Sequence, residues 1–198
     1  MAKDPEVKTF LKAVEGSMWG MSGEDKARAT EDIEKYLRRT AAEFEKRTHA
    51  DNAMELAVST LPSPEVIGTG CRRLYGYGLD VKMGLIAVVC LLSLFTVPVY
   101  PLASVLTLPI TFFIAVLSAR EMGIGTAAGL GLGGALSRSV FAYMMFTMAP
   151  DSYDPGGPGL IYFAATSVLF VVASLIAGLV HEEDMRRAVM KATTKMEG

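Results

Sequence analysis

The chain has few of the residues on which most catalytic and metal sites depend. Its 198 residues include two cysteines and two histidines, and His49 and His181 lie far apart in sequence. Ser-His-Asp, Cys-His and HExxH patterns do not occur, so we expect no catalytic residue, metal site or bound cofactor. Cys71 precedes the first apolar segment and Cys90 falls inside it, so we expect both to be unbridged. These absences predict that the protein is not an enzyme.

Charge is also scarce over the C-terminal half. Residues 1–80 hold 12 of the 19 lysines and arginines and 14 of the 21 acidic residues. The net charge of -2 gives no indication of nucleic-acid binding. The chain therefore has a charged N-terminal part and an apolar C-terminal part, which join near residues 75–80. Residues 81–180 contain only Lys82, Arg120, Glu121, Arg138, Asp151 and Asp154 as charged side chains.

The apolar half divides into four segments, each of a length suited to a membrane. A helix crosses the hydrocarbon core with about 20 residues. Pro109 should bend the second segment, because its nitrogen cannot donate to the preceding turn. The predicted spans are 81–97, 102–119, 122–149 and 160–180.

Four spans place every basic cluster on one side of the membrane. The loops 98–101 and 150–158, which fall on the other side, contain no lysine or arginine. Since basic residues favour the cytoplasmic side, both termini are expected in the cytoplasm of a cell-membrane protein. The basic residues on that side are Arg72, Arg73, Lys82, Arg120, Arg186, Arg187, Lys191 and Lys195.

Small residues recur along the start of the third segment. Gly125, Gly129 and Gly133 form one row at every fourth position, and Gly131 lies in a second row. Such rows let helices approach closely, which predicts tight packing in one bundle or in a homo-oligomer. The alternative is an unwound or re-entrant segment that binds a ligand.

Arg138 is the one charge expected at depth in the membrane. An arginine at the centre of a spanning helix costs about 2.5–3.5 kcal/mol on insertion scales, so it should have a partner. Three explanations stay open: contact with an anion or lipid headgroup, a structural partner in the bundle or oligomer, and snorkelling to the interface. The other predicted spans offer no buried carboxylate, which argues against a proton relay.

The first 78 residues have the pattern of short amphipathic helices. We expect helices over 5–16 and from Ser22, an N-cap, to about residue 47. Asp51 or Asn52 should cap a third helix, and Ser63 a fourth that begins with Pro64. Their apolar faces predict a small domain core of Phe10, Leu11, Ile33, Tyr36, Leu37 and Phe44.

This helix pattern resembles the HAAS domain, which precedes transmembrane spans in many prokaryotic membrane proteins. The resemblance covers about residues 5–75 and includes the segment Leu-Pro-Ser-Pro-Glu-Val-Ile at 61–67. Pro62 stands where the family usually has glycine, and 17–21 replace its usual Leu-Pro connection. The resemblance implies a role in regulation, with a PadR-like transcription regulator as the cytoplasmic partner, and carries over no catalytic residue.

The sequence thus predicts an all-α membrane protein. A cytoplasmic helical domain over 1–78 precedes a four-helix transmembrane bundle over 79–181, and 182–198 form an amphipathic tail or a continuation of the last span. The function we expect is regulation, signalling or adaptation, with the bilayer and a cytoplasmic protein as partners. The alternatives are a subunit of a small oligomeric transporter or channel that uses Arg138, and a structural subunit of a larger membrane complex.

Overall fold

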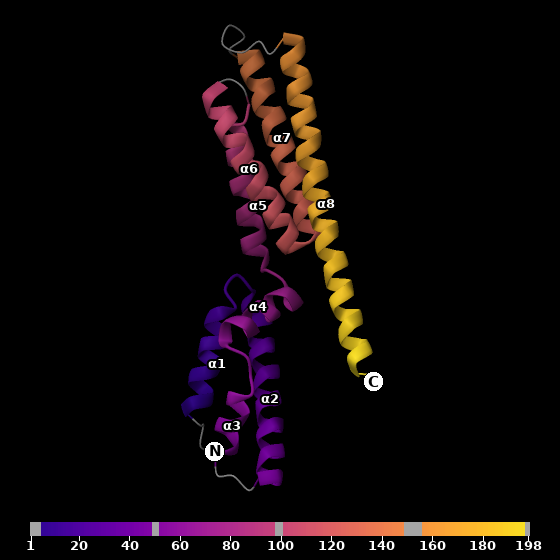
Figure 1. Cartoon of the computed structure of the whole chain (residues 1–198). Coiled ribbons are helices and arrows are strands. Elements are labelled where there is room, and N and C mark those ends of the chain that lie inside the picture. The colour runs from indigo at the N-terminus through magenta and orange to yellow at the C-terminus, as the bar shows by residue number, and fades with distance from the viewer. Residues whose placement is uncertain (1–4, 49–51, 98–100, 149–155, 197–198) are drawn as a thin grey trace. The chain divides into compact units, whose positions relative to one another are not determined.

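The residues that the computed structural model describes, 5–48, 52–97, 101–148 and 156–196, form eight α-helices and no strand (Figure 1). The chain divides into two compact units, Met1–Leu79 and Asp80–Gly198. The first ends one residue after the end predicted for the N-terminal domain. Each unit has its own hydrophobic clusters, so each is described by itself.

The N-terminal unit consists of four helices, α1 (Pro5–Ser17), α2 (Gly23–Thr48), α3 (Ala53–Ser59) and α4 (Pro64–Tyr75). The Ser22 hydroxyl accepts the backbone N–H of Asp25 at 3.1 Å and donates to its carboxylate, which confirms the predicted cap of α2. Asn52 and Ser63 precede α3 and α4 as expected, but neither side chain bonds the backbone of its helix. A backbone hydrogen bond to the Glu65 carboxylate lowers the pKa of that carboxyl, and the Ser63 hydroxyl, which also bonds it, lowers this pKa further.

Two apolar clusters hold these helices together, because α1 packs on α4, α2 and α3, and α2 packs on α3. Phe10, Leu11, Ile33, Leu37 and Phe44 lie in them as predicted. The buried residues of the clusters are Val14, Met18, Met21 and Ala29 in one, and Leu37, Ala41 and Ala57 in the other.

The placement of Tyr36 in the core was wrong, because its side chain is 54% exposed. Successive residues of an α-helix point about 100° apart. Leu37 occupies the centre of the face that α2 turns toward the domain, so Tyr36 is directed away from it. An aromatic at the edge of an amphipathic stripe cannot be distinguished from a core residue by spacing alone.

The second unit consists of α5 (Leu79–Leu94), α6 (Pro101–Met122), α7 (Ile124–Met148) and α8 (Gly156–Met196). The helix α8 packs on α6 and α7, and α6 packs on α7. The core of the second unit contains Phe170 and Leu130 among small residues, and the Phe112 ring meets the Phe170 ring edge-on. The Gly-rich start of α7 is helical throughout, so the unwound alternative does not apply to it.

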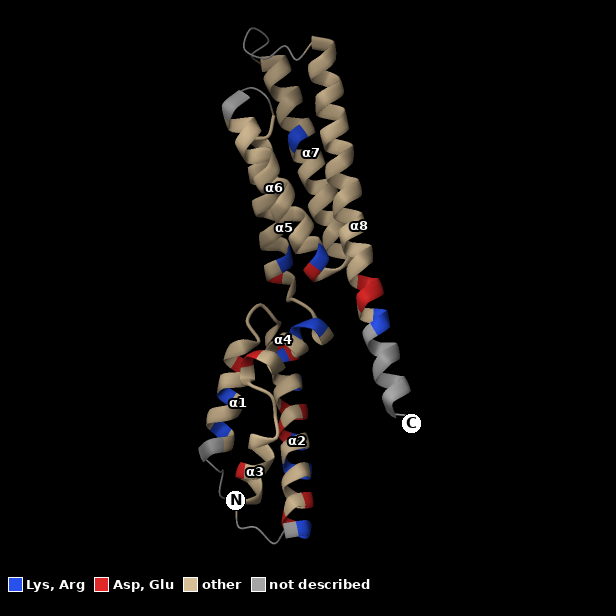
Figure 2. Cartoon of the chain, viewed as in Figure 1, with Lys and Arg blue, Asp and Glu red and all other residues tan. Residues whose placement is uncertain are grey.

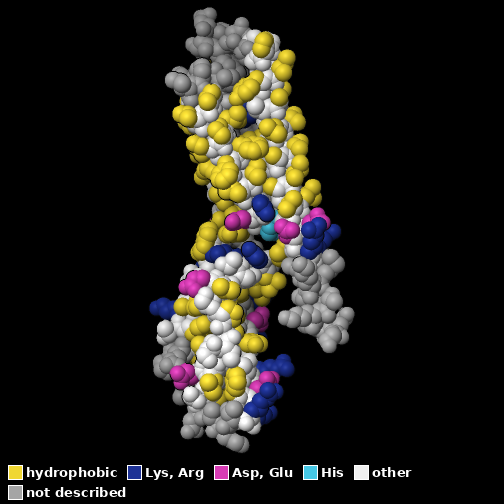
Figure 3. Space-filling view, viewed as in Figure 1, with side chains coloured by type: hydrophobic (Ala, Val, Ile, Leu, Met, Phe, Trp, Pro, Cys, Tyr) yellow, Lys and Arg dark blue, Asp and Glu magenta, His cyan; other side chains and the backbone are white. Residues whose placement is uncertain are grey.

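Two of these helices, α6 and α8, are long and apolar enough to cross a membrane. Hydrophobic side chains cover most of the visible face of the second unit (Figure 3). Among the described residues the number rises to three if α4 and α5 form one bent span. With 16 residues, α5 is shorter than the usual span. The 25 residues of α7 suffice in length, but its glycines and Arg138 lower its hydropathy.

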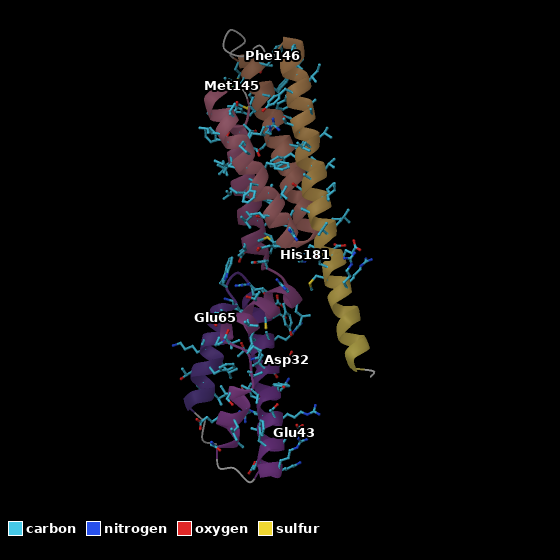
Figure 4. The ribbon with its side chains drawn as sticks, viewed as in Figure 1. Asp32, Glu43, Glu65, Met145, Phe146 and His181 are labelled. Atoms are coloured by element: carbon cyan, nitrogen blue, oxygen red, sulfur yellow. The ribbon has the colours of Figure 1, made fainter. Side chains whose placement is uncertain are left out.

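The helix α8 continues through 182–196 without a break, so these residues extend the last predicted span and do not form a separate tail. His181, in the same helix, donates a hydrogen bond from its Nδ1–H to the carbonyl oxygen of Arg120 at 2.8 Å (Figure 4). That bond fixes α8 against the last turn of α6, where backbone carbonyls need a partner. The His181 side chain is half-buried at this contact.

Candidate functional site

Arg138 lies in α7 and is completely buried within the second unit. Its Nη2 donates to the Thr166 hydroxyl at 2.8 Å, and its guanidinium carbon lies 5.0 Å from the centre of the Phe163 ring. The Thr166 hydroxyl in turn donates to the Tyr162 carbonyl oxygen at 2.8 Å. Thr166, Phe163 and Tyr162 all belong to α8. Arg138 therefore joins α7 to α8 through a charge-assisted hydrogen bond and a cation–π contact.

This environment decides between two of the explanations left open for Arg138. Snorkelling requires a guanidinium that reaches the edge of the apolar region, and complete burial excludes it here. A structural partner in the bundle is present, namely Thr166. Figure 2 shows the isolation of this charge: the basic position of α7 lies away from the charged residues that gather where α5 begins and α6 ends.

Two serine hydroxyls of the neighbouring helices are buried in the same unit. The Ser93 hydroxyl of α5 comes within 3.0 Å of the position that a Cβ on Gly134, one turn before Arg138, would take. Ser167 follows Thr166 in α8, and the oxygens of Ser93 and Ser167 are buried without a hydrogen-bond partner among the described residues. Sequence reasoning did not single out these two serines, because a single serine in an apolar helix is common.

The glycines of α7 face two different helices. A Cβ on Gly129 would lie 2.6 Å from the Ile86 side chain of α5, and a Cβ on Gly133 would lie 3.0 Å from the Cys90 sulfur of the same helix. A Cβ on Gly131 would lie 3.1 Å from the backbone of Val171 in α8. These three glycines therefore allow the close packing that was predicted. Gly125 is different: it faces open space in the single chain, so no helix of the chain fills it in this structure.

A second group of interacting side chains lies in the N-terminal unit, and sequence reasoning missed it. Arg72 of α4 donates to the Ser17 carbonyl at 3.0 Å and to the Thr69 hydroxyl at 3.2 Å. Its guanidinium carbon lies 5.0 Å from the centre of the Trp19 ring, and Trp19 meets Tyr77 edge-on at 5.8 Å. The Gly78 N–H also donates to the Gly20 carbonyl at 2.7 Å. The turn after α1 is thus fixed to the last residues before α5.

The described residues contain no group of three or more histidine, cysteine or acidic side chains that could hold a metal ion. Cys71 and Cys90 are free thiols. His49 lies outside the described residues.

Comparison with known proteins gives no relative: no family model matches the chain, and neither the curated proteins nor the solved structures include a match. Over its described residues the fold is that of an all-helical protein with two to three helices suited to a membrane.

Proposed function

We propose that the protein is a membrane-anchored regulatory or adaptor protein. In this proposal α5–α8 hold it in the cell membrane with both termini in the cytoplasm, and the N-terminal unit binds a cytoplasmic protein. The observation that carries it is the division of the chain into two separate units of opposite surface character, one charged and one apolar.

The surface of the second unit supports four spans. Large apolar side chains are exposed along all four of its helices, a surface that water disfavours and lipid does not. The buried Arg138 explains how α7 can be a span in spite of its charge, because its guanidinium is covered by α8. The exposed side chains include Leu91, Phe95, Phe113, Ile110, Leu136, Val140, Ile161, Val168 and Leu169.

The outer face of α2 is the surface we propose for the protein partner. Exposed ion pairs, including Glu31–Lys35, Glu34–Arg38 and Arg39–Glu43, run along this helix. Such pairs contribute little to stability. Among them stands the exposed ring of Tyr36, and an aromatic within a charged surface is a common anchor of protein interfaces. The likeness to HAAS domains makes a PadR-like regulator the partner we expect.

The test is co-purification of the full-length protein, in mild detergent, with a candidate PadR-like regulator. The Tyr36→Ala, Arg39→Glu double variant should lose the stoichiometric partner, whereas a Lys12→Glu variant on α1 should retain it. Recovery of the same proteins with both variants would contradict a regulatory partner on α2.

A second function, transport of a small anion by an oligomer, has one specific observation in its favour. Arg138 bonds the Thr166 hydroxyl, and two further buried hydroxyls of this unit, those of Ser93 and Ser167, could accept or donate along a polar path. In proteoliposomes, Arg138→Gln should then abolish flux while the protein stays folded, and Ser139→Ala should leave it unchanged. Absence of flux for chloride, phosphate and acetate in the unaltered protein would count against transport.

A further inference from the structure

Helix α5 is held on the rest of the second unit mainly by its side chains. The helices α6, α7 and α8 pack directly on one another, whereas the backbone of α5 approaches them closely at few points. Val89 of α5 is buried in the core of the unit, and Leu85 and Ile86 pack against that core. A movement of α5 along its own axis would therefore leave the packing of α6, α7 and α8 intact.

The contact between α5 and α7 repeats at the same spacing on both helices. Gly125, Gly129 and Gly133 of α7 recur at every fourth residue, and Ile86 and Cys90 of α5 are also four residues apart. The Ile86 side chain lies where a Cβ on Gly129 would be, and the Cys90 sulfur lies against Gly133. A Cβ on Gly125 would meet nothing within 4 Å. The row on α7 thus has three open positions, and α5 fills two of them.

A shift of α5 by one helical turn, about 5.4 Å, would restore the same kind of fit. Moved toward the start of α7, Ile86 would lie at Gly125 and Cys90 at Gly129. The side chain of Lys82, four residues before Ile86, does not come within 4 Å of the Cβ position on Gly125, so it does not block this place. Packed helices move in such discrete steps, because a side chain must leave one gap and enter the next.

The present register leaves one polar group of α5 without a hydrogen bond. The Ser93 side chain is completely buried, its oxygen points at Gly134 of α7, and it has no hydrogen-bond partner among the described residues. Other hydroxyls of this unit, such as those of Thr111 and Ser139, donate to the carbonyl four residues earlier in their own helix. A buried hydroxyl without a partner costs free energy, which narrows the advantage of the present register. Away from Gly134, Ser93 can donate to the Val89 carbonyl in the same way.

The far end of α5 permits the shift. The Thr107 hydroxyl of α6 donates to the Phe95 carbonyl at 2.9 Å, a bond that the shift would break. The same hydroxyl donates to the Ala103 carbonyl at 2.7 Å, so it keeps an acceptor when α5 moves. Residues 95–100 join α5 to α6, and six residues span up to about 20 Å when extended.

The N-terminal unit holds the chain up to the residue that precedes α5. The Gly78 N–H donates to the Gly20 carbonyl at 2.7 Å, and the Tyr77 ring meets the Trp19 ring edge-on. The helix α5 begins at the next residue, Leu79. Continuity of the chain therefore passes a movement of the N-terminal unit to α5, whatever the orientation of the two units.

We propose that α5 has a second register on α7, one turn nearer the start of α7, and that the N-terminal unit selects between the two. Ile86 lies at Gly125 in the second register, and Cys90 lies at Gly129. A protein bound to the N-terminal unit would then change the arrangement of the apolar helices by pulling or releasing α5. As a route of regulation the shift rests on the proposed function, whereas the second register does not.

Disulfide formation in the full-length protein, in mild detergent, distinguishes the two registers. In a Cys71→Ala background, Gly133→Cys should bond the native Cys90 in the present register, because the Cys90 sulfur lies 3.0 Å from the new Cβ. Ile86→Cys with Gly125→Cys, in a Cys71→Ala, Cys90→Ala background, should bond only in the second register. We expect this 86–125 bond to form at least about tenfold more slowly than the 90–133 bond, as for a state populated at about 10% or less.

Two matched variants make the result specific. Val88→Cys with Gly125→Cys should form no bond in either register, because Val88 lies on the exposed side of α5. Trp19→Ala, which removes the contact with Tyr77, should raise the rate of the 86–125 bond severalfold, because α5 can then shift without moving the whole N-terminal unit. Leu74→Ala, at an exposed position of the same unit, should leave that rate unchanged.

Each contrary outcome has a distinct meaning. Formation of the 90–133 bond without the 86–125 bond would overturn the second register. A bond between two chains at Gly125→Cys, seen as a dimer on a non-reducing gel in place of the 86–125 bond, would assign the open position to another copy and also overturn it. An unchanged rate with Trp19→Ala would overturn selection by the N-terminal unit. If both bonds form and respond as expected but the N-terminal unit binds no protein, only the proposed function is contradicted.

Discussion

Two glycines in α4 show how one residue sets the distance between helices in the N-terminal unit. A Cβ on Gly68 would lie 2.7 Å from the Ser17 Cβ and 2.8 Å from its carbonyl carbon, whereas a Cβ on Gly70 would meet nothing within 4 Å. Ser17 cannot move easily, because its hydroxyl is bonded to the Pro64 carbonyl. The absence of a side chain at Gly68 is therefore what lets α1 cross α4.

We predict that Gly68→Ala destabilises the N-terminal unit by about 1–3 kcal/mol, the usual cost of overpacking. Gly70→Ala should instead stabilise it by about 1 kcal/mol, because alanine is the better helix former at an exposed site. The check is urea unfolding of full-length protein in detergent, followed by Trp19 emission. Equal midpoints for the two variants would show that α1 and α4 can separate without cost.

The hydrogen bond between Arg138 and Thr166 provides a second test at this scale. Thr166→Val keeps the shape of the side chain but removes the acceptor, so it should lower the stability of the second unit by about 1 kcal/mol, as for other interhelical hydrogen bonds in membranes. Ser139→Ala is the control, since the Ser139 hydroxyl bonds only the Ala135 carbonyl in its own helix. Thermal loss of helical ellipticity in detergent measures both. A Thr166→Val protein as stable as the unaltered one would remove the structural role of Arg138.

Alkaline pH should weaken the N-terminal unit through two partly buried groups that pack against its core. Burial raises the pKa of the Cys71 thiol, and burial and the hydrogen bond to Asp32 raise the pKa of Tyr75. A pKa raised by folding means that the neutral group stabilises the folded state below the unfolded pKa, and that this stabilisation is lost as pH rises through the folded pKa. Urea midpoints from Trp19 emission should therefore fall above the ordinary thiol pKa. Cys71→Ala should show a smaller fall, and an identical fall would exclude Cys71 as a cause.

At the scale of helices, α7 and α8 are held together by small residues on both sides. A Cβ on Gly178 of α8 would lie 2.7 Å from the Ala127 Cβ and 2.9 Å from the backbone of Ile124. We expect Gly178→Ala to push the helices apart and to lower the melting temperature of the second unit in detergent. Gly125→Ala, at a site facing open space, should not lower that temperature. If Gly125→Ala instead shifts the native mass, that glycine serves a contact between chains.

The helices themselves could largely be predicted from sequence, because caps, prolines and apolar periodicity are local signals. Ser22 with Asp25 marked the start of α2, and the scarcity of charge after residue 80 indicated the apolar helices. The features that could not be predicted were contacts between residues of different helices. Arg138 and Thr166 are 28 residues apart, and Trp19 and Arg72 are 53 apart, so their contacts depend on how helices cross. Tyr36 failed for a related reason, since only the packed domain shows which edge of α2 is covered.

For the whole molecule, the charge distribution and the length of α8 make a joint argument for orientation. Gly157 and Glu182 lie at the two ends of its apolar part, separated by 25 residues or about 38 Å of helix. The hydrocarbon core of a bilayer is about 30 Å thick, so one helix can place these two residues in different compartments. Lysine and arginine follow Glu182 and are absent from 150–158.

We therefore predict that Gly157→Cys reacts with a membrane-impermeant maleimide in intact cells, and that Glu182→Cys reacts only after permeabilisation, each in a Cys71→Ala, Cys90→Ala background. Gly157 is exposed and Glu182 is partly exposed in the structure, so burial within the protein would not fully mask either thiol. Labelling of Glu182→Cys alone from outside would show that the orientation is opposite to the predicted one. With an even number of spans, the N-terminal unit would then lie outside the cell. Labelling of both positions from outside would mean that α8 does not cross the membrane, and the four-span arrangement would fail with it.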